Sequence, residues 1–240
     1  MSKIHVLLKK EELDNERLAS KVVVVLDILF ATSSIVAALA HGAAEVVPTP
    51  DGTAAAAEAA RRPAGSYLLA GELNAETLPG FAHPMPLALL QEEISGRSLI
   101  YSTTNGTVAL NKSRDAAHVY AAALLNGEAV VQHIVRTHPD STVLVVCSGS
   151  ADNFNLEDFY GAGYIVSLFR KIGGTHEFSD AALAAEMLHA HADATDCLQR
   201  SRVGRLMLAR NLEAEVHFAT LKSVFDIVPQ LAPDGSLRLL

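Results

Sequence analysis

A recurring feature of this sequence is a polar or small residue directly after an apolar run. The residues in such positions are Asp27, Glu72, Thr103, Thr104, Asn105, Asn126, Ser148 and Gly149. In open α/β sheets, ligands bind beyond the carboxyl ends of the strands. Mg²⁺ uses one or two carboxylates and leaves its other positions to water and phosphate oxygens. Two acids and several hydroxyl groups at one sheet edge therefore suit a magnesium ion and a phosphate group, without defining a reaction.

The densest of these segments is Thr103-Thr104-Asn105-Gly106-Thr107, which follows the apolar run at 98–102. Asn-Gly allows the positive φ of a sharp turn, and glycine lets the backbone approach a ligand closely. Such a loop before a helix offers N–H and hydroxyl donors to an anion. A plain turn with a threonine helix cap is the alternative, because hydroxyl-rich turns are common.

Each acid also has a simpler interpretation when it is taken alone. Asp27 is then a helix-capping residue, and Glu72 is an ion-paired loop residue. Glu157, in the first turn of a helix expected at 155–172, is either favourably placed near the positive helix end or serves as a metal ligand or general base.

Two arginines stand three residues apart in a helix expected at 196–210. Arg202 and Arg205 share one helical face and could hold a pair of anionic oxygens, or lie on a solvated surface. The sequence contains no HExxH, GxSxG, GxGxxG or GxxxxGK[ST] pattern. The zinc-protease, serine-hydrolase, dinucleotide and P-loop interpretations therefore lack support.

The composition narrows the class of protein. The 240 residues are 50% hydrophobic and 19% charged, with a formal net charge of −8. This balance argues against binding to nucleic acid or to an anionic membrane surface. The two cysteines show no metal spacing, and the first ten residues lack the apolar core of a signal peptide. We therefore expect a reduced, cytoplasmic protein without membrane spans, and the apolar content makes a homo-oligomer plausible.

Apolar runs alternate with helical patterns along the whole chain. Strands are expected at residues 4–8, 21–27, 45–48, 67–72, 98–102, 118–126, 142–147, 214–219, 224–229 and 237–240. The segment 118–126 is either a strand throughout or a strand that runs into a turn at Asn126-Gly127. Helices are expected at residues 35–41, 53–62, 87–94, 128–137, 155–172, 180–192 and 196–210, and from Thr107 onward. This order predicts one α/β domain over residues 1–240, a three-layer α/β/α sandwich with a largely parallel or mixed sheet.

Four segments carry more specific expectations. The first and last strands are expected at sheet edges, and residues 9–17 are expected to form a solvated helix or loop. The proline-containing segment 73–86 is expected to be a long irregular loop, either a lid or a connection between subdomains.

These motifs, in this order, resemble the 2-phosphosulfolactate phosphatases, the ComB family. The matching pieces are residues 25–29 with 31–32, 70–72, 80–81, 103–107, 125–126, 147–149, 156–158 with 162–163, Ser201 with 204–205, and 228–229 with 234–235. The resemblance covers about residues 22–237. The Thr-Thr-Asn-Gly-Thr and Leu-Glu-Asp pieces are its most specific parts.

The resemblance implies Mg²⁺-dependent hydrolysis of 2-phosphosulfolactate to sulfolactate and phosphate, a step related to coenzyme M biosynthesis. It implies that Asp27 is either the nucleophile or a metal ligand and that Glu72 supports the metal. Thr103 to Thr107 would cradle the phosphate, and Arg205 would face an anionic group of the substrate.

The sequence also departs from the family pattern. Phe30 and Leu73 stand where the family usually has arginine, and residues 82–86, Val203 and Glu215 also differ from it. Each lost arginine removes charge-assisted donors worth roughly 1.5–3 kcal/mol against a buried anion. A trianionic sulfonated substrate would be affected most, so a less charged phosphate ester is also consistent with the sequence.

Three hypotheses follow for the function. The first is a Mg²⁺-dependent phosphatase acting on a small phosphate ester. The second is a non-catalytic or weakly active paralogue that binds a small anion. The third is an α/β module for a nucleotide or methyl donor, although the sequence lacks the glycine fingerprint of such modules.

Overall fold

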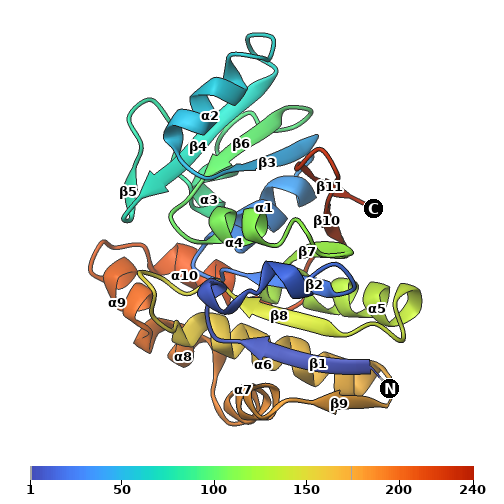
Figure 1. The fold of residues 1–240 in the computed structure, drawn as a ribbon. Helices are drawn as coiled ribbons and strands as arrows, with labels where there is room; N and C mark the ends of the chain where they lie inside the picture. Colours follow the sequence, from blue (N-terminus) through green and yellow to red (C-terminus); the bar gives the residue numbers. More distant parts are fainter. Residues whose placement is uncertain (1, 174) are drawn as a thin grey trace.

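The computed structural model describes residues 2–173 and 175–240, in which eleven strands form one mixed sheet (Figure 1). The strands are β1 (Ser2–Leu7), β2 (Val22–Leu26), β3 (Glu45–Thr49), β4 (Tyr67–Leu73), β5 (Glu76–Thr77), β6 (Ser98–Ser102), β7 (His118–Ala122), β8 (Val143–Cys147), β9 (His176–Phe178), β10 (Pro229–Leu231) and β11 (Leu237–Leu239). Their order is β5-β4-β6-β3-β11-β10-β7-β2-β8-β1-β9.

The sheet consists of two parallel parts joined by an antiparallel hairpin. Strands β4, β6 and β3 pair in parallel, as do β7, β2, β8, β1 and β9. The hairpin β10-β11 lies between them and joins each part through a single residue pair, Gln230 with Tyr120 and Leu237 with Val46. The parallel, βαβ-type arrangement confirms the predicted α/β class.

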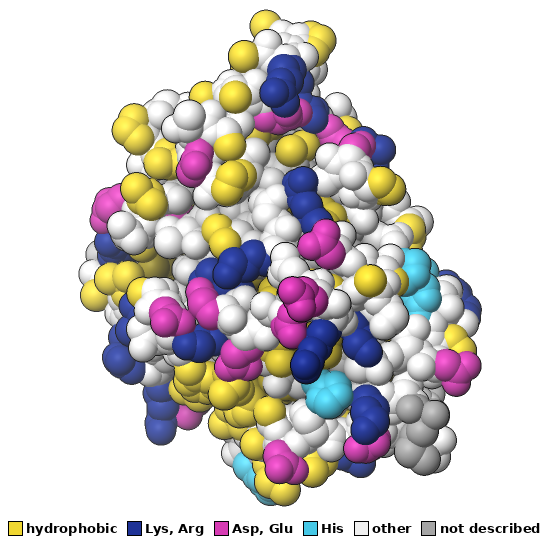
Figure 2. Space-filling view, viewed as in Figure 1, with side chains coloured by type: hydrophobic (Ala, Val, Ile, Leu, Met, Phe, Trp, Pro, Cys, Tyr) yellow, Lys and Arg dark blue, Asp and Glu magenta, His cyan; other side chains and the backbone are white. Residues whose placement is uncertain are grey.

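Ten α-helices occur in the described residues. They are α1 (Ala31–Ala40), α2 (Gly52–Ala59), α3 (Pro86–Leu89), α4 (Gly106–Lys112), α5 (Gly127–Thr137), α6 (Leu156–Ile172), α7 (Asp180–His191), α8 (Ala194–Arg200), α9 (Arg202–Leu208) and α10 (Glu213–Ala219). No helix in residues 2–173 and 175–240 has both the length and the apolar character needed to cross a bilayer. Figure 2 shows that basic and acidic side chains intermingle over the face in view.

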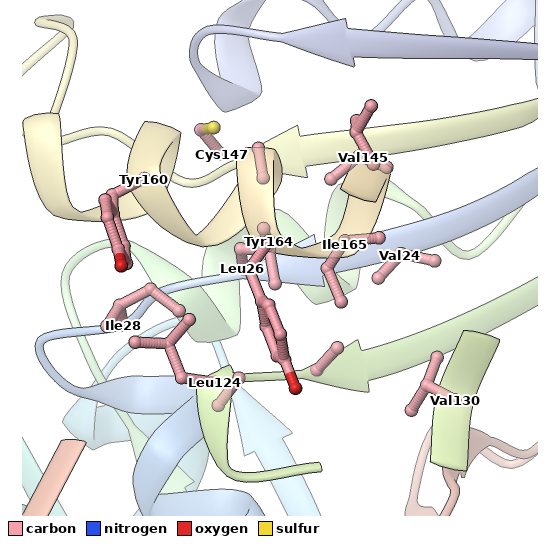
Figure 3. Packing of buried hydrophobic residues seen from close by; sticks show 14 of the residues in the cluster. Val24, Leu26, Ile28, Leu124, Val130, Val145, Cys147, Tyr160, Tyr164 and Ile165 are labelled. Carbon is pink, nitrogen blue, oxygen red and sulfur yellow. The ribbon is translucent and has the colours of Figure 1, made fainter. Parts of the chain in front are cut away.

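The central strand β2 is buried on both of its faces, as five consecutive apolar residues predict. Val24 and Leu26 belong to a core with α5 and α6, and Figure 3 shows Tyr164 and Ile165 of α6 near them. Val23 and Val25 face a second core, which contains apolar residues of α1 and α4. Helices therefore cover both faces of the sheet, and each fully buried valine contributes about 1.5–3 kcal/mol of hydrophobic stabilisation.

Several expected elements differ from the structure near the C-terminus. Residues 214–219 form helix α10 rather than a strand, because Glu215, Val216 and Ala219 share its buried face. Of residues 224–229, only Pro229 belongs to a strand. The expected helix at 196–210 is two helices, α8 and α9, separated by Ser201 in an extended conformation.

The expected sheet edges were also wrong. Strand β1 lies inside the sheet because β9, which the sequence analysis did not predict, pairs with its outer side. The C-terminal strand β11 lies near the middle of the sheet rather than at its edge, because it pairs with β3 and β10.

Three shorter expectations hold in part. Strand β7 ends at Ala122 and is followed by a 3₁₀ turn at Leu124–Asn126. The expected helix at 87–94 is reduced to α3, Pro86–Leu89. The expected solvated segment 9–17 forms two 3₁₀ turns, Lys10–Glu12 and Asn15–Arg17, and Lys10 is buried in the first of them.

Candidate active site

A pocket of about 330 Å³ lies beyond the carboxyl ends of β2, β4, β6 and β8. Its polar lining residues include Asp27, Glu72, Thr103, Thr104, Asn105, Ser150, Asn155 and Arg202. Segments far apart in the sequence therefore meet where the strand-end rule for α/β sheets places a ligand. The pocket brings together the two acids and the hydroxyl-rich loop that the sequence analysis singled out.

Asp27 is a nearly buried acid, with 8% of its surface exposed. Burial raises the pKa of its carboxyl group to about 7, and the negative charges of Glu72 and Glu157 act in the same direction. The N–H of Ala31 and the ammonium group of Lys10 oppose this shift. Burial therefore disfavours the charged form of the Asp27 carboxyl group. Perturbed pKa values of this kind are common among catalytic residues.

Two helix N-termini meet at this carboxyl group. Ala31 is the first residue of α1, and its backbone N–H lowers the pKa of the Asp27 carboxyl group. Gly106 is the first residue of α4, and a Cβ atom added there would lie 2.7 Å from Oδ2 of Asp27. A glycine is required at this position because any side chain would collide with the acid. The positive ends of both helices therefore point to the region around Asp27.

The loop before α4 is fixed by its own threonines. The backbone N–H of Thr103 donates to Oγ1 of Thr107 at 3.0 Å, and the N–H of Thr107 donates to Oγ1 of Thr103 at 3.2 Å. The Thr107 hydroxyl donates to the carbonyl of Thr103 at 2.9 Å. Thr107 thus shapes the loop from a fully buried position, whereas Thr103 and Thr104 line the pocket.

Glu72 joins the end of β4 to the loop after β6. Its Oε1 accepts a hydrogen bond from the N–H of Thr104 at 2.6 Å. Its Oε2 accepts from the N–H of Ala75 at 2.6 Å and from the Thr104 hydroxyl at 3.1 Å. These donors hold the Glu72 carboxyl group in a fixed orientation at the pocket wall.

Lys10 is a site residue that the sequence analysis missed. Its side chain is buried, and its Nζ donates to Oδ1 of Asn105 at 3.1 Å and to the carbonyl of Ser148 at 3.2 Å. It also pairs with Glu11 at 3.1 Å. The lysine therefore orients the pocket residue Asn105 and ties the loop after β6 to the loop after β8. No local motif marked it, because it lies in a run of charged residues.

Glu157 and Asp158 lie at the start of α6 beneath the pocket. Both oxygens of Asp158 accept backbone hydrogen bonds, from Ile28 at 2.9 Å and from Gly149 at 3.1 Å. Burial, with Asp27 and Glu157 nearby, raises the pKa of Asp158 well above its usual range. Glu157 is 1% exposed, and burial raises its pKa as well. Within the described part of the chain, neither carboxyl oxygen of Glu157 accepts a hydrogen bond, and Glu157 does not line the pocket.

Four other candidate residues lie outside the pocket lining. Asn126 is buried, and its side chain binds the N–H of Ala123 and the carbonyl of Ile227. Gly149 has a φ of +61°, which a side chain rarely adopts, and Ser148 is fully buried beside it. Gly106 acts through its close approach to Asp27, as described above. The geometry thus gives these residues structural contacts, and their direct binding of phosphate stays a prediction.

The arginine at the pocket is Arg202. It lines the pocket and donates to Oγ of Ser150, which in turn donates to Oδ1 of Asn155 at 2.7 Å. Arg205 is exposed, does not line the pocket and donates to the carbonyl of Arg200. Both arginines belong to α9, but the residues of this helix that line the pocket are Arg202, Val203, Leu206 and Met207, so of the two arginines only Arg202 reaches it.

The pocket offers hard oxygen donors of the kind that Mg²⁺ prefers. In residues 2–173 and 175–240, no group of three or more His, Cys, Asp or Glu side chains is arranged to hold a metal ion. A bound magnesium ion commonly needs only one or two carboxylates and takes its other ligands from water and phosphate. Asp27 and Glu72, with the nearby threonine hydroxyls, fit that requirement.

Comparison with known proteins agrees with the family resemblance of the sequence motifs. The family model of 2-phosphosulpholactate phosphatase matches residues 7–234. A protein of Symbiobacterium thermophilum described as a probable 2-phosphosulfolactate phosphatase is 35% identical over 228 residues, which cover 94% of this chain and 97% of that protein.

Two further relatives carry the same description. The Deinococcus radiodurans protein is 33% identical over 226 residues, covering 91% of this chain and 93% of its own length. The Clostridium beijerinckii protein is 30% identical over 239 residues, covering 98% of both chains. Given these matches along almost its whole length, the chain belongs to the 2-phosphosulpholactate phosphatase family.

Proposed function

We propose that this protein is a Mg²⁺-dependent phosphatase that hydrolyses 2-phosphosulfolactate or a related small phosphate monoester. The observation that carries the proposal is the meeting of Asp27, Glu72 and the Thr103–Thr104 hydroxyls in one pocket, with the first residues of α1 and α4 at Asp27. Phosphoryl transfer requires mainly positioning and charge neutralisation, and this set of groups provides both.

The resident metal would be held by the carboxylates of Asp27 and Glu72. When bound, Mg²⁺ neutralises charge on the phosphoryl oxygens and orients the ester. Glu72 is preset for this role because Thr104 and Ala75 fix both of its oxygens. Burial opposes the charge of Asp27, so a nearby cation would favour its ionised form.

The phosphate would lie against the start of α4 and the Thr103 side chain. The hydroxyl of Thr103 accepts from the N–H of Thr107, and it donates to Oγ1 of Thr107 at a long oxygen–oxygen distance of 3.4 Å. A phosphoryl oxygen can replace that weak contact with a shorter hydrogen bond. The helix dipoles of α1 and α4 favour the negative charge at the same place.

In the overall reaction, a water oxygen bonds to phosphorus while the bond from phosphorus to the ester oxygen breaks. The leaving oxygen takes up a proton, which gives the free alcohol and inorganic phosphate. Arg202, which also lines the pocket, would bind an anionic group of the alcohol part.

The test is phosphate release from 2-phosphosulfolactate and a panel of phosphate monoesters, with and without Mg²⁺. We expect Mg²⁺-dependent release, and we expect Asp27→Asn to lower kcat by about a thousandfold. Asp51→Asn is the matched control, since Asp51 caps α2 away from the pocket and asparagine also caps helices. Absence of release from every ester would contradict the proposal, and wild-type turnover by Asp27→Asn would remove Asp27 from the site.

A further inference from the structure

Lys222, in the segment between α10 and β10, has an unusual set of partners outside the pocket. Its Nζ donates to the hydroxyl oxygen of Tyr160 at 2.9 Å and to Nε2 of His189 at 3.0 Å. Nζ also lies 5.2 Å from the centre of the Tyr160 ring and 5.3 Å from the centre of the Tyr164 ring. Both rings project from the same side of α6 (Figure 3). These four residues are called the lysine cluster below.

The partners of Lys222 are neutral side chains. In residues 2–173 and 175–240, this lysine forms no ion pair with a carboxylate. Burial lowers the pKa of Lys222, while the charge of Asp193 and the two ring faces act in the opposite direction. The cluster therefore increases the fraction of Lys222 that is present as the free amine, which is the nucleophilic form of a lysine.

His189 is placed to accept a proton from this amine. The ammonium group of a lysine can only donate, so Nε2 of His189 accepts and the ring proton lies on Nδ1. Burial and the Lys222 charge lower the pKa of His189 to about 4, with Glu186 opposing, so its imidazole is neutral at about pH 7. A neutral imidazole within hydrogen-bond distance of a nucleophile is a common arrangement for a base.

The lysine cluster favours acylation of the amine over imine formation. Imine formation needs an acid that helps to expel water. The Tyr160 hydroxyl donates its proton to the carbonyl of Ala192, and burial raises the pKa of Tyr160 to about 12. Acyl transfer from an acyl phosphate needs only a proton acceptor, because phosphate is a stable leaving anion. His189 supplies that acceptor.

We propose that Lys222 is a modification site that takes an acyl group from small acyl phosphates. The amine nitrogen bonds to the carbonyl carbon, the bond from that carbon to the phosphate oxygen breaks, and phosphate leaves with the electron pair. The nitrogen loses one proton to Nε2 of His189, which passes it to the departing phosphate. The products are an uncharged N-acyl lysine and inorganic phosphate.

The position of Lys222 allows this reaction without involving the phosphatase site. Lys222 is exposed to solvent, so a small acyl phosphate can reach its amine. None of the four members of the lysine cluster lines the pocket that holds Asp27 and Glu72. The inference therefore goes beyond the proposed phosphatase function and does not depend on it.

The test uses acetyl phosphate as the probe and measures the acetylation rate of each lysine by peptide mass spectrometry. Lys112 and Lys171 are the internal references, because both are exposed and neither forms an ion pair in the part of the chain that the structure describes. We expect Lys222 to react about fivefold faster than either reference at about pH 7.5. In urea-unfolded protein, the three rates should become equal. A Lys222 rate at or below the references in the folded protein, or an advantage that persists after unfolding, would overturn the inference.

Replacement of the base tests the proton transfer. His189→Gln keeps a polar side chain at this half-buried position but cannot take up the proton. We expect the Lys222 rate to fall to that of the references, whereas His191→Gln, at an exposed position on α7, should leave it unchanged. Circular dichroism shows whether each variant is folded, and if His189→Gln does not fold, the wild-type rates before and after unfolding decide the inference. An unchanged Lys222 rate in folded His189→Gln would contradict it.

Discussion

Replacing Gly106 by alanine is the sharpest structural test of how the candidate site is built. A Cβ atom at this position would lie 2.7 Å from Oδ2 and 3.0 Å from Cβ of Asp27, and it would also collide with Cβ of Ala31. Neither neighbour can move freely, because Ala31 begins α1 and Asp27 is nearly buried. Overpacking of this kind costs about 1–3 kcal/mol of folding free energy.

Gly52→Ala is the matched control for this variant. Gly52 is the first residue of α2, as Gly106 is of α4, but an added Cβ would lie 3.2 Å from Cδ1 of Leu78, the end of a flexible side chain. Both variants gain up to about 1 kcal/mol from the higher helix propensity of alanine. We therefore expect Gly106→Ala to be less stable than Gly52→Ala by about 1–3 kcal/mol, or by about 2–4 °C in Tm for each kcal/mol.

Urea unfolding gives the stability difference, and phosphatase kinetics give its functional counterpart. The start of α4 must move away from Asp27 in Gly106→Ala, and a displacement near 1 Å at a reacting group lowers the rate about a hundredfold. Gly52→Ala should keep wild-type kinetics. If both variants prove equally stable and equally active, the close approach of α4 to Asp27 is not what shapes the site.

Three other predictions concern charged residues. Lys10→Met should lose about 2–3 kcal/mol of stability in urea unfolding, because Asn105 and Ser148 lose a buried hydrogen-bond donor. The control is Lys9→Met, which removes an exposed ion pair with Asp152 and should stay within about 0.5 kcal/mol of wild type. Equal losses of stability in the two variants would refute the role of Lys10. Arg202→Ala should raise the KM for the phosphate ester at least tenfold, whereas Arg205→Ala should leave it unchanged. The reverse result would show that Arg205, not Arg202, binds the substrate. Burial and the nearby Lys222 ammonium lower the pKa of His189 to about 4, with Glu186 opposing and Tyr160 and Tyr164 packed against the ring. Between about pH 6.5 and pH 4 this histidine binds a proton more readily in the unfolded chain than in the folded chain. The free energy of unfolding should therefore fall as the pH falls through that window, by about 1–2 kcal/mol after allowance for solvent screening. His189→Gln should show less of this loss than His191→Gln in urea titrations at pH 7 and pH 4.5, and identical pH profiles would contradict the assignment.

The sequence predicted the parts of the fold that depend on long apolar runs. The unbroken apolar run of β2 indicated a strand buried on both faces, and the structure confirms it. Because polar residues follow such strands directly, the meeting of Asp27, Glu72 and the Thr103–Thr104 segment could also be anticipated. Their catalytic and metal-binding roles stay predictions.

Local patterns could not reveal features that depend on distant partners. Strand β9 has three residues and exists because it pairs with β1. The last strand, β11, lies inside the sheet because β3 and β10 pair with it, which no local signal encodes. Lys10 resembles its charged neighbours in sequence, and only the folded chain buries it against Asn105. Arg202 and Arg205 are equivalent by spacing, and only the position of α9 relative to the pocket separates them.

The most direct test of the site is a crystal structure of the protein with Mg²⁺ and orthovanadate, an analogue of the phosphoryl group in transfer. The account predicts a metal ion about 2.1 Å from a carboxylate oxygen of Asp27, with the vanadate between that ion, Thr103 and the start of α4. Vanadate bound at another surface, with no metal ion at Asp27 or Glu72, would contradict it.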